Sequence, residues 1–253
     1  MEEVRTVKVA RGLSIVAPWH SILLEKEGVC VLADLHLGIE KELESKGVQV
    51  PANLYPMIFR PVEESIKGTG CERVILLGDV KHEFGRPSEE EWFFVKKLIK
   101  EIRGMGCEPE VVRGNHDNYI ISILKLMDVK LHQPHLRLGR FVLTHGHVKV
   151  EEKGHLIIGH EHPSVSIRDE LGVRHRFKAF LSGRVGGRRI TVLPSVSPLA
   201  YGSCVNELPS EELLSPMLKG MDLGELVPYV LEPGVDVRRF PKLSDLSGAG
   251  DGI

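Results

Sequence analysis

Short apolar runs alternate with amphipathic stretches through the first half of the chain. Residues 28–33, 73–77 and 110–112 are mostly apolar and rich in β-branched side chains, which is typical of buried strands. A helix is predicted to begin at Ser88, because Glu91 stands three residues later and apolar side chains follow. The pattern therefore predicts a βαβαβ arrangement of parallel strands, with functional residues gathered beyond their carboxyl ends.

From about residue 129 the apolar runs become shorter and more closely spaced. They occupy residues 129–131, 140–143, 156–158, 178–181 and 189–193, which predicts a second, mostly β half. The last ten residues, 244–253, are small and polar, so we expect them to fray.

Composition and charge narrow the class of protein. The 253 residues are 42% hydrophobic and 27% charged, as in ordinary globular proteins. The net charge of −2 provides no global field that would draw the chain to nucleic acid or to an anionic membrane. The sequence has neither a signal-peptide pattern nor an apolar run long enough to span a membrane, which predicts a cytoplasmic protein without membrane contact. Its four cysteines form no CxxC pair, and we expect inert, buried thiols.

Polar residues follow each of the three strands predicted in the first half. The first strand runs into Asp34 and His36, whose spacing of two places both side chains on one face of extended backbone. The second is followed by Gly78 and Asp79, and the third by residues 113–117, Arg-Gly-Asn-His-Asp. Each cluster alone is typical of a turn or a helix cap. Three clusters at one sheet edge favour a metal site instead.

Histidines extend this pattern into the second half, where residues 144–147 read Thr-His-Gly-His and residues 159–162 read Gly-His-Glu-His. Nitrogen and oxygen ligands without cysteine suit Mn²⁺, Fe or Zn²⁺. The candidate ligands are Asp34, His36, Asp79, Asn115, His145, His160 and His162. They are too many for one catalytic ion, so we expect two ions, about 3.5 to 4 Å apart, that share a carboxylate and activate a bridging water. The pattern predicts metal-assisted phosphoester hydrolysis.

The order of these motifs between residues 34 and 162 resembles the signature of the calcineurin-like metallophosphoesterase superfamily. Details at residues 33–38, 113–117 and 193–194 are similar to archaeal putative phosphoesterases related to the repair nuclease SbcD, and to bacterial phosphoesterases associated with DNA ligases. The resemblance implies an α/β fold, a four-layer sandwich of two mixed β-sheets flanked by helices. It also implies a single domain over residues 1–253, with a core of about residues 28–200 and residues 205–253 as a C-terminal appendage.

The resemblance further implies a role for each residue. One ion would be held by Asp34, His36, Asp79 and His162, and the other by Asp79, Asn115, His145 and His160, with Asp79 as the bridge. A hydroxide between the ions would be the nucleophile. His116 would protonate the leaving oxygen as a general acid, and Asp117 would orient it. Mn²⁺ is the favoured cofactor, with Fe, Zn²⁺, Ni²⁺ and Co²⁺ as alternatives.

Three further positions keep more than one interpretation. His82 could contact substrate, support Asp79 or be an ordinary loop residue. His147 could replace His145 as a ligand, although the superfamily pattern favours His145. Arg113 could bind phosphate through its guanidinium or form an ordinary surface ion pair.

The substrate also stays open. The resemblance favours a phosphodiesterase that acts on nucleic acid or nucleotides in DNA repair, and it suggests a helicase or ligase partner. Residues 168–189 hold seven Lys or Arg against two acids, a stretch that could track a nucleic-acid backbone or form the exposed face of a hairpin. A small-molecule phosphatase is the alternative within the same chemistry. A non-catalytic metal-binding scaffold of the same fold is the alternative outside it.

Overall fold

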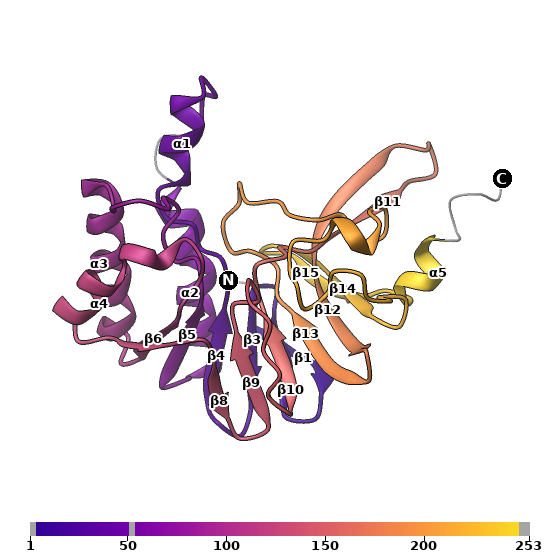
Figure 1. Ribbon diagram of the computed structural model, residues 1–253, viewed down its shortest axis with the longest axis horizontal. Coiled ribbons are helices and arrows are strands. Elements are labelled where there is room, and N and C mark those ends of the chain that lie inside the picture. The colour runs from indigo at the N-terminus through magenta and orange to yellow at the C-terminus, as the bar shows by residue number, and fades with distance from the viewer. Residues whose placement is uncertain (1–3, 51–53, 248–253) are drawn as a thin grey trace.

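Two β-sheets face each other at the centre of the molecule (Figure 1). The structure, a computed structural model, describes residues 4–50 and 54–247. The first sheet has the order β1-β2-β3-β4-β5-β6-β7, with β1 Arg5–Ala10, β2 Leu13–Ala17, β3 Ser21–Leu24, β4 Val29–Leu32, β5 Arg73–Leu77, β6 Glu108–Val112 and β7 Lys130–His132.

The second sheet has the order β15-β14-β12-β13-β10-β9-β8, and β11 pairs with β12 beside it. Its strands are β8 Leu136–Leu138, β9 Phe141–Thr144, β10 His155–Ile158, β11 Ser164–Arg168, β12 Arg174–Val185, β13 Arg188–Val192, β14 Val227–Glu232 and β15 Asp236–Arg239. The helices are α1 Ile39–Ser45, α2 Tyr55–Thr69, α3 Glu89–Gly104, α4 Ile121–Leu126 and α5 Leu243–Ser247, with short 3₁₀ turns at Asp117–Tyr119 and Ser210–Glu212. Among the described residues, no helix has both the length and the apolar character needed to cross a membrane.

The parallel arrangement predicted for the first half is confirmed. Strands β4, β5, β6 and β7 pair in parallel, and α2 and α3 connect the first three of them. The β-rich second half is confirmed as well, with β10 lying parallel to both β9 and β13. Because parallel neighbours end at the same edge of a sheet, the loops that follow β4, β5 and β6 are brought together.

Successive side chains of each strand point to opposite faces of its sheet, and the apolar core therefore forms three layers. On β4, Cys30 and Leu32 face the helices α2 and α3, whereas Val29 and Val31 face the second sheet. On β10, Ile157 faces the first sheet, and its neighbours point outward. Strands buried on both faces read as continuous apolar runs, which is why they could be found from the sequence. All four cysteines are free and buried, as expected.

The fourth layer is made mostly of irregular chain. Leu213, Leu218, Leu223 and Leu226 lie on the outer face of the second sheet and contribute to its apolar cluster. The predicted four-layer sandwich is therefore confirmed, although helices cover mainly the first sheet (Figure 1).

Two boundaries expected from the sequence need correction. Residues 205–247, the described part of the segment 205–253, are not an appendage, because β14 pairs with β12 over five residue pairs and β15 extends the sheet further. The core also begins well before residue 28, since β1, β2 and β3 complete the first sheet. Of the ten terminal residues expected to fray, those up to 247 belong to α5, and the last six lie outside the described residues.

Helix α3 begins at Ser88, as predicted, with a complete capping box. The Ser88 side chain accepts a hydrogen bond from the Glu91 backbone N–H at 3.1 Å, and the Glu91 carboxylate accepts one from the Ser88 N–H at 2.9 Å. The same buried carboxylate accepts hydrogen bonds from the backbone N–H groups of His82 and Glu83. Glu91 thus fixes both the start of α3 and the loop after β5.

We expect Glu91→Ala to lower the free energy of unfolding by about 2 to 4 kcal/mol, because three backbone N–H groups lose a buried, charged acceptor. Chemical denaturation would measure this. Glu89→Ala, which removes an exposed carboxylate from the same helical turn, is the matched control and should change the free energy by less than about 0.5 kcal/mol. Equal unfolding midpoints for the two variants would contradict the role given to Glu91.

Candidate metal centre

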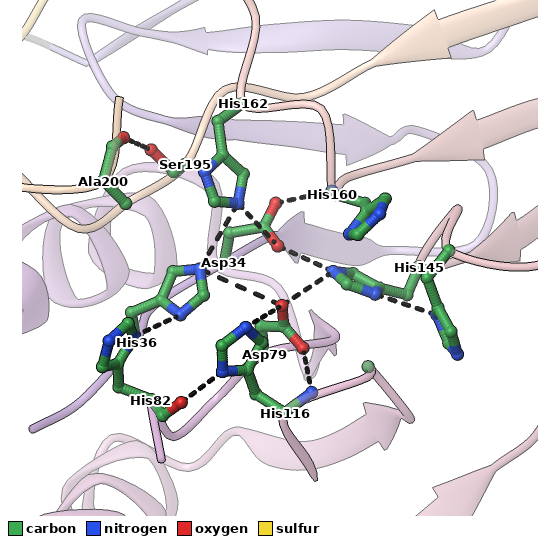
Figure 2. A network of polar contacts seen from close by, with 12 residues as sticks. Asp34, His36, Asp79, His82, His116, His145, His160, His162, Ser195 and Ala200 are labelled. Atoms are coloured by element: carbon green, nitrogen blue, oxygen red, sulfur yellow. Dashed lines mark hydrogen bonds and ion pairs between the residues drawn. The ribbon is translucent and has the colours of Figure 1, made fainter. Parts of the chain in front are cut away.

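Five strands deliver polar side chains to one site (Figure 2). The first sheet contributes three clusters directly after its strands, and the second sheet contributes two. They are Asp34 and His36 after β4, Asp79 after β5, Asn115 and His116 after β6, His145 after β9, and His160 and His162 after β10. Every candidate ligand predicted from the sequence therefore lies at a carboxyl end of a strand, at the junction between the two sheets.

Left-handed backbone turns the chain sharply at these positions. Six described residues other than glycine have positive φ, and five of them are candidate ligands: Asp34, His36, Asp79, His160 and His162. Such conformations cost about 1 to 3 kcal/mol each and are found mainly where function requires them. Backbone hydrogen bonds hold the turns in place, including those from the Asp34 N–H to the Gly78 carbonyl and from the His36 N–H to the Asp79 carbonyl.

Two glycines leave room for the carboxylates. A Cβ on Gly159 would lie 2.6 Å from Oδ2 of Asp34, and a Cβ on Gly114 would overlap the side chain of Asp79. The backbone therefore approaches both carboxylates more closely than any other residue would allow. The His160 N–H donates to Asp34 Oδ2 at 3.0 Å, and the His116 N–H donates to Asp79 Oδ1 at 2.9 Å.

The remaining oxygen of each carboxylate faces imidazole nitrogens. Asp34 Oδ1 lies 2.8 Å from Nε2 of His145 and 3.3 Å from Nε2 of His162. Asp79 Oδ2 lies 3.5 Å from Nε2 of His145 and 4.0 Å from Nε2 of His36. Three groups of side chains among the described residues have their ligand atoms within 4.8 Å of one another. Two of them contain a carboxylate and are the triads Asp34–His36–His162 and Asp79–His145–His160, and the third consists of His36, His82 and His116. Each triad takes its members from one of the two ligand sets implied by the resemblance, but neither contains Asn115, and Asp79 occurs in only one of them.

Asn115 provides a separate indication of a cation. Its Oδ1 is buried and has no hydrogen-bond partner among the described residues. A buried carbonyl oxygen without a partner is costly, and a metal ion is one of the few groups that would satisfy it. The donor set of carboxylate, carboxamide and imidazole groups therefore fits a site for divalent metal ions.

Two groups at the same centre, His145 and Asp79, have raised pKa values. Burial alone would lower the pKa of His145, but Asp79 and Asp34 together raise it to about 9. Burial and the nearby carboxylate of Asp34 raise the pKa of Asp79 to about 7, against the opposing charge of His145. Metal ligands must be deprotonated, so a cation binding here would displace these protons.

His116 lies beside the triads with its ring fixed by the backbone. Its Nδ1 donates to the carbonyl oxygen of His82, and its Nε2 lies 3.9 Å from Asp79 Oδ2. Burial lowers the pKa of His116 to about 4. The neutral ring therefore carries its proton on Nδ1 and presents the lone pair of Nε2 to the site.

The contacts of Asp117 differ from what the sequence suggested. Its carboxylate accepts hydrogen bonds from the backbone N–H groups of Val80 and Gly114, at 3.0 and 2.9 Å. It thereby joins the loops after β5 and β6, whereas the carbonyl of His82 orients the His116 ring. The Arg113 guanidinium donates to Gln133 and Asn118, in ordinary polar contacts at the protein surface.

His82 and His147, whose roles the sequence left open, occupy equivalent places. His82 Nδ1 lies 3.2 Å from Nδ1 of His36, and His147 Nδ1 lies 3.1 Å from Nδ1 of His145. On its other side, His82 Nε2 contacts the carboxylate of Glu42. Because the carboxylate accepts the Nε2 proton, His82 Nδ1 must accept from His36, which leaves His36 Nε2 free to bind a cation.

The sequence analysis missed three residues that shape the site. Glu42 on α1 anchors His82. The exposed ring of Phe84 lies 3.7 Å from the His116 ring, centroid to centroid. Glu161, between the two histidines of the last motif, is fully buried and accepts hydrogen bonds from Ser203 and from the backbone of residues 214 and 215. Its position between two candidate ligand histidines in the sequence could have indicated a role at the site.

Comparison with known proteins supports the architecture. No family model matches the sequence, and no curated protein matches it. Among solved structures, the nuclease MPE of Pseudomonas putida aligns with a TM-score of 0.64 at 19% sequence identity, covering 94% of this chain and 100% of the nuclease. The chain has the fold of that nuclease. The phosphoesterase YfcE of E. coli aligns with a TM-score of 0.43 at 18% identity, over 85% of this chain and 98% of that one.

We expect Glu42→Ala to weaken metal binding about 10- to 100-fold, because residues that orient a ligand histidine typically have effects of this size. Competition with a fluorescent chelator would measure the dissociation constant. Glu44→Ala removes an exposed carboxylate from the same helix and should leave the constant unchanged. If both variants bind metal as tightly as the wild type, Glu42 has no part in orienting His36.

Proposed function

We propose that this protein is a two-metal phosphoesterase that hydrolyses phosphodiester bonds. The observation that carries the proposal is the convergence of two carboxylates, one carboxamide and four imidazoles from five strand ends. The carboxylates and imidazoles form the two triads, and the carboxamide of Asn115 adds a seventh donor. In this proposal Asp34, His36, Asp79 and His162 hold one divalent ion, and Asp79, Asn115, His145 and His160 hold the other. Mn²⁺ is the favoured ion, given its acceptance of mixed nitrogen and oxygen ligands.

Two such ions, when bound, neutralise phosphoryl oxygens and lower the pKa of water, which is the chemistry that phosphoester hydrolysis needs. The protein's own residues position the reaction. Gly114 and Gly159 allow the backbone to hold one oxygen of each carboxylate, so the other oxygen stays directed at the site. The Nδ1 contacts of His36 and His145 with His82 and His147 direct their Nε2 atoms inward.

His116 is the proposed general acid. Its Nδ1 proton is already donated to the His82 carbonyl, so the proton given to the leaving oxygen must be carried on Nε2. An anionic phosphate near the ring favours the imidazolium form, which offsets the effect of burial on its pKa. Phe84, packed against the ring, keeps it in place.

A nucleic acid or a nucleotide is the proposed substrate class. The fold is shared with a protein described as a nuclease, and phosphodiesters are the bonds that nucleases hydrolyse. The alternative substrates are phosphate monoesters of small molecules.

We expect metal-stripped protein to be inactive and Mn²⁺-reconstituted protein to hydrolyse bis-p-nitrophenyl phosphate faster than p-nitrophenyl phosphate. Asp79→Asn should lose bound metal and activity together, because it removes the shared carboxylate. His116→Ala should keep its metal and lose about 10² to 10⁴ in kcat. Metal content by mass spectrometry and initial rates would test these outcomes.

His175→Ala is the control, because this histidine is exposed and its ring nitrogen is bound to the carboxylate of Asp169, away from the candidate ligands. It should retain the wild-type rate and metal content. Wild-type rates in Asp79→Asn would reject the proposed centre, and a preference for the monoester would reject the diester assignment.

A further inference from the structure

A cavity lies next to the metal centre, on the other side of a short loop. It has a volume of about 320 Å³ and is lined by residues from both sheets and from α2, among them Trp19, Arg60, Arg176, Lys178, Tyr201 and Glu232. Small-ligand sites have volumes of roughly 300 to 1,000 Å³, so this cavity has room for a group of nucleoside size.

The loop after β13 forms the wall between the cavity and the metal centre. The Ser197 N–H donates to the Asp34 carbonyl, and the Gly202 N–H donates to the His162 carbonyl, both at 3.2 Å. Figure 2 shows Ser195 and Ala200 of this loop next to His162. The buried ammonium of Lys178 donates to Ser195 from the cavity side. A substrate with its phosphate at the centre could therefore place a neighbouring group in the cavity.

Aromatic rings and cations alternate along the cavity lining. Tyr201 is 54% exposed, and its ring lies 5.5 Å from the Arg176 guanidinium carbon and 5.2 Å from Lys178 Nζ. The lining also includes Trp19, whose buried ring lies 5.3 Å from the Arg60 guanidinium carbon. Exposed aromatic rings flanked by cations are the surfaces on which unpaired bases stack.

A row of cations leads from the cavity along the β11–β12 hairpin. The register pairs Arg168 with Arg174, Ser166 with Arg176 and Ser164 with Lys178, which places all four cations on one face. Alternate residues of a strand are about 6.8 Å apart, a spacing close to that of successive phosphates in an extended strand. The hairpin projects from the second sheet (Figure 1).

The outer part of this row carries unfavourable charge contacts in the free protein. Arg168 and Arg174 lie directly opposite each other, and like charges in that position are destabilising. Glu207 lies 3.4 Å from Arg174, so it offsets part of the repulsion. A bound polyanion would offset the rest.

We propose that the cavity and this row bind single-stranded nucleic acid, with a base stacked on Tyr201 and the phosphates that follow bound by Arg176, Arg174 and Arg168. The inference rests on the proposed phosphodiesterase function, because it gives the metal centre its substrate. The base is placed in the cavity because the exposed Tyr201 ring lines it, and the phosphates are placed on the hairpin because Arg168, Arg174 and Arg176 are exposed there.

The test is fluorescence anisotropy with a short labelled oligothymidylate in the presence of EDTA, so that the strand is bound without hydrolysis. Arg168→Gln combined with Arg174→Gln should weaken binding and reduce the slope of log K against log salt by about 1.4, or 0.7 for each contact. Tyr201→Ala should weaken binding about 5-fold or more, and Tyr201→Phe, which keeps the ring, should restore it.

The matched control combines Arg184→Gln with Arg189→Gln. These exposed arginines form a directly opposed pair at the other end of β12, so the charge change is the same. The control should bind like the wild type. The proposal would be overturned if both double variants lost the same affinity for the single strand. It would also be overturned if a blunt duplex bound more tightly than the single strand, or if thymidine monophosphate competed as well as unlabelled oligothymidylate.

Hydrolysis of the aryl diester by the wild-type protein separates the two conclusions. Hydrolysis without strand binding would reject the binding surface and leave the phosphodiesterase in place. Strand binding at this surface without hydrolysis would reject the phosphodiesterase.

Discussion

Left-handed turns directly after the strands are the constraint on which the rest of the site depends. Five candidate ligands adopt positive φ, each at a cost of about 1 to 3 kcal/mol. The cost is tolerated because these turns are bonded to one another and follow strands whose side chains are fully buried. An extended chain at Asp34 or Asp79 would carry the carboxylate past the sheet edge, away from the imidazoles it now meets.

The sequence was most informative where a buried strand is followed directly by candidate metal ligands. The runs that became β4, β5 and β6 are apolar on both faces, and each is followed at once by a carboxylate or carboxamide, so both strand and site could be inferred together. Strand β1 gave no such signal because most of its residues are exposed or half-buried. Strand β14 contains Pro228 and follows a long irregular segment, and its place beside β12 depends on pairing across about fifty residues.

Residues that act through a ligand were the hardest to predict. Glu42 meets His82 across 40 residues, and His82 meets His36 across 46. No local spacing encodes such contacts, because they arise only when α1 and the loop after β5 have folded against each other. Asp117 was also predicted incorrectly. Its motif suggested that it orients His116, but its buried carboxylate accepts hydrogen bonds from the backbone N–H groups of Val80 and Gly114.

The division of ligands between the sheets links metal binding to the fold. Among the candidate ligands, Asp34, His36, Asp79 and Asn115 come from the first sheet, and His145, His160 and His162 come from the second, so neither sheet holds the complete candidate set. The centre is therefore complete only when the apolar layer between the sheets is packed, with Ile75 and Leu77 on one side and Leu143 and Ile157 on the other. In the free protein the buried charges of this centre are balanced mainly by protons on His145 and Asp79. A cation that replaces those protons binds only the state in which both sheets are packed, so its binding free energy adds to the stability of the whole sandwich.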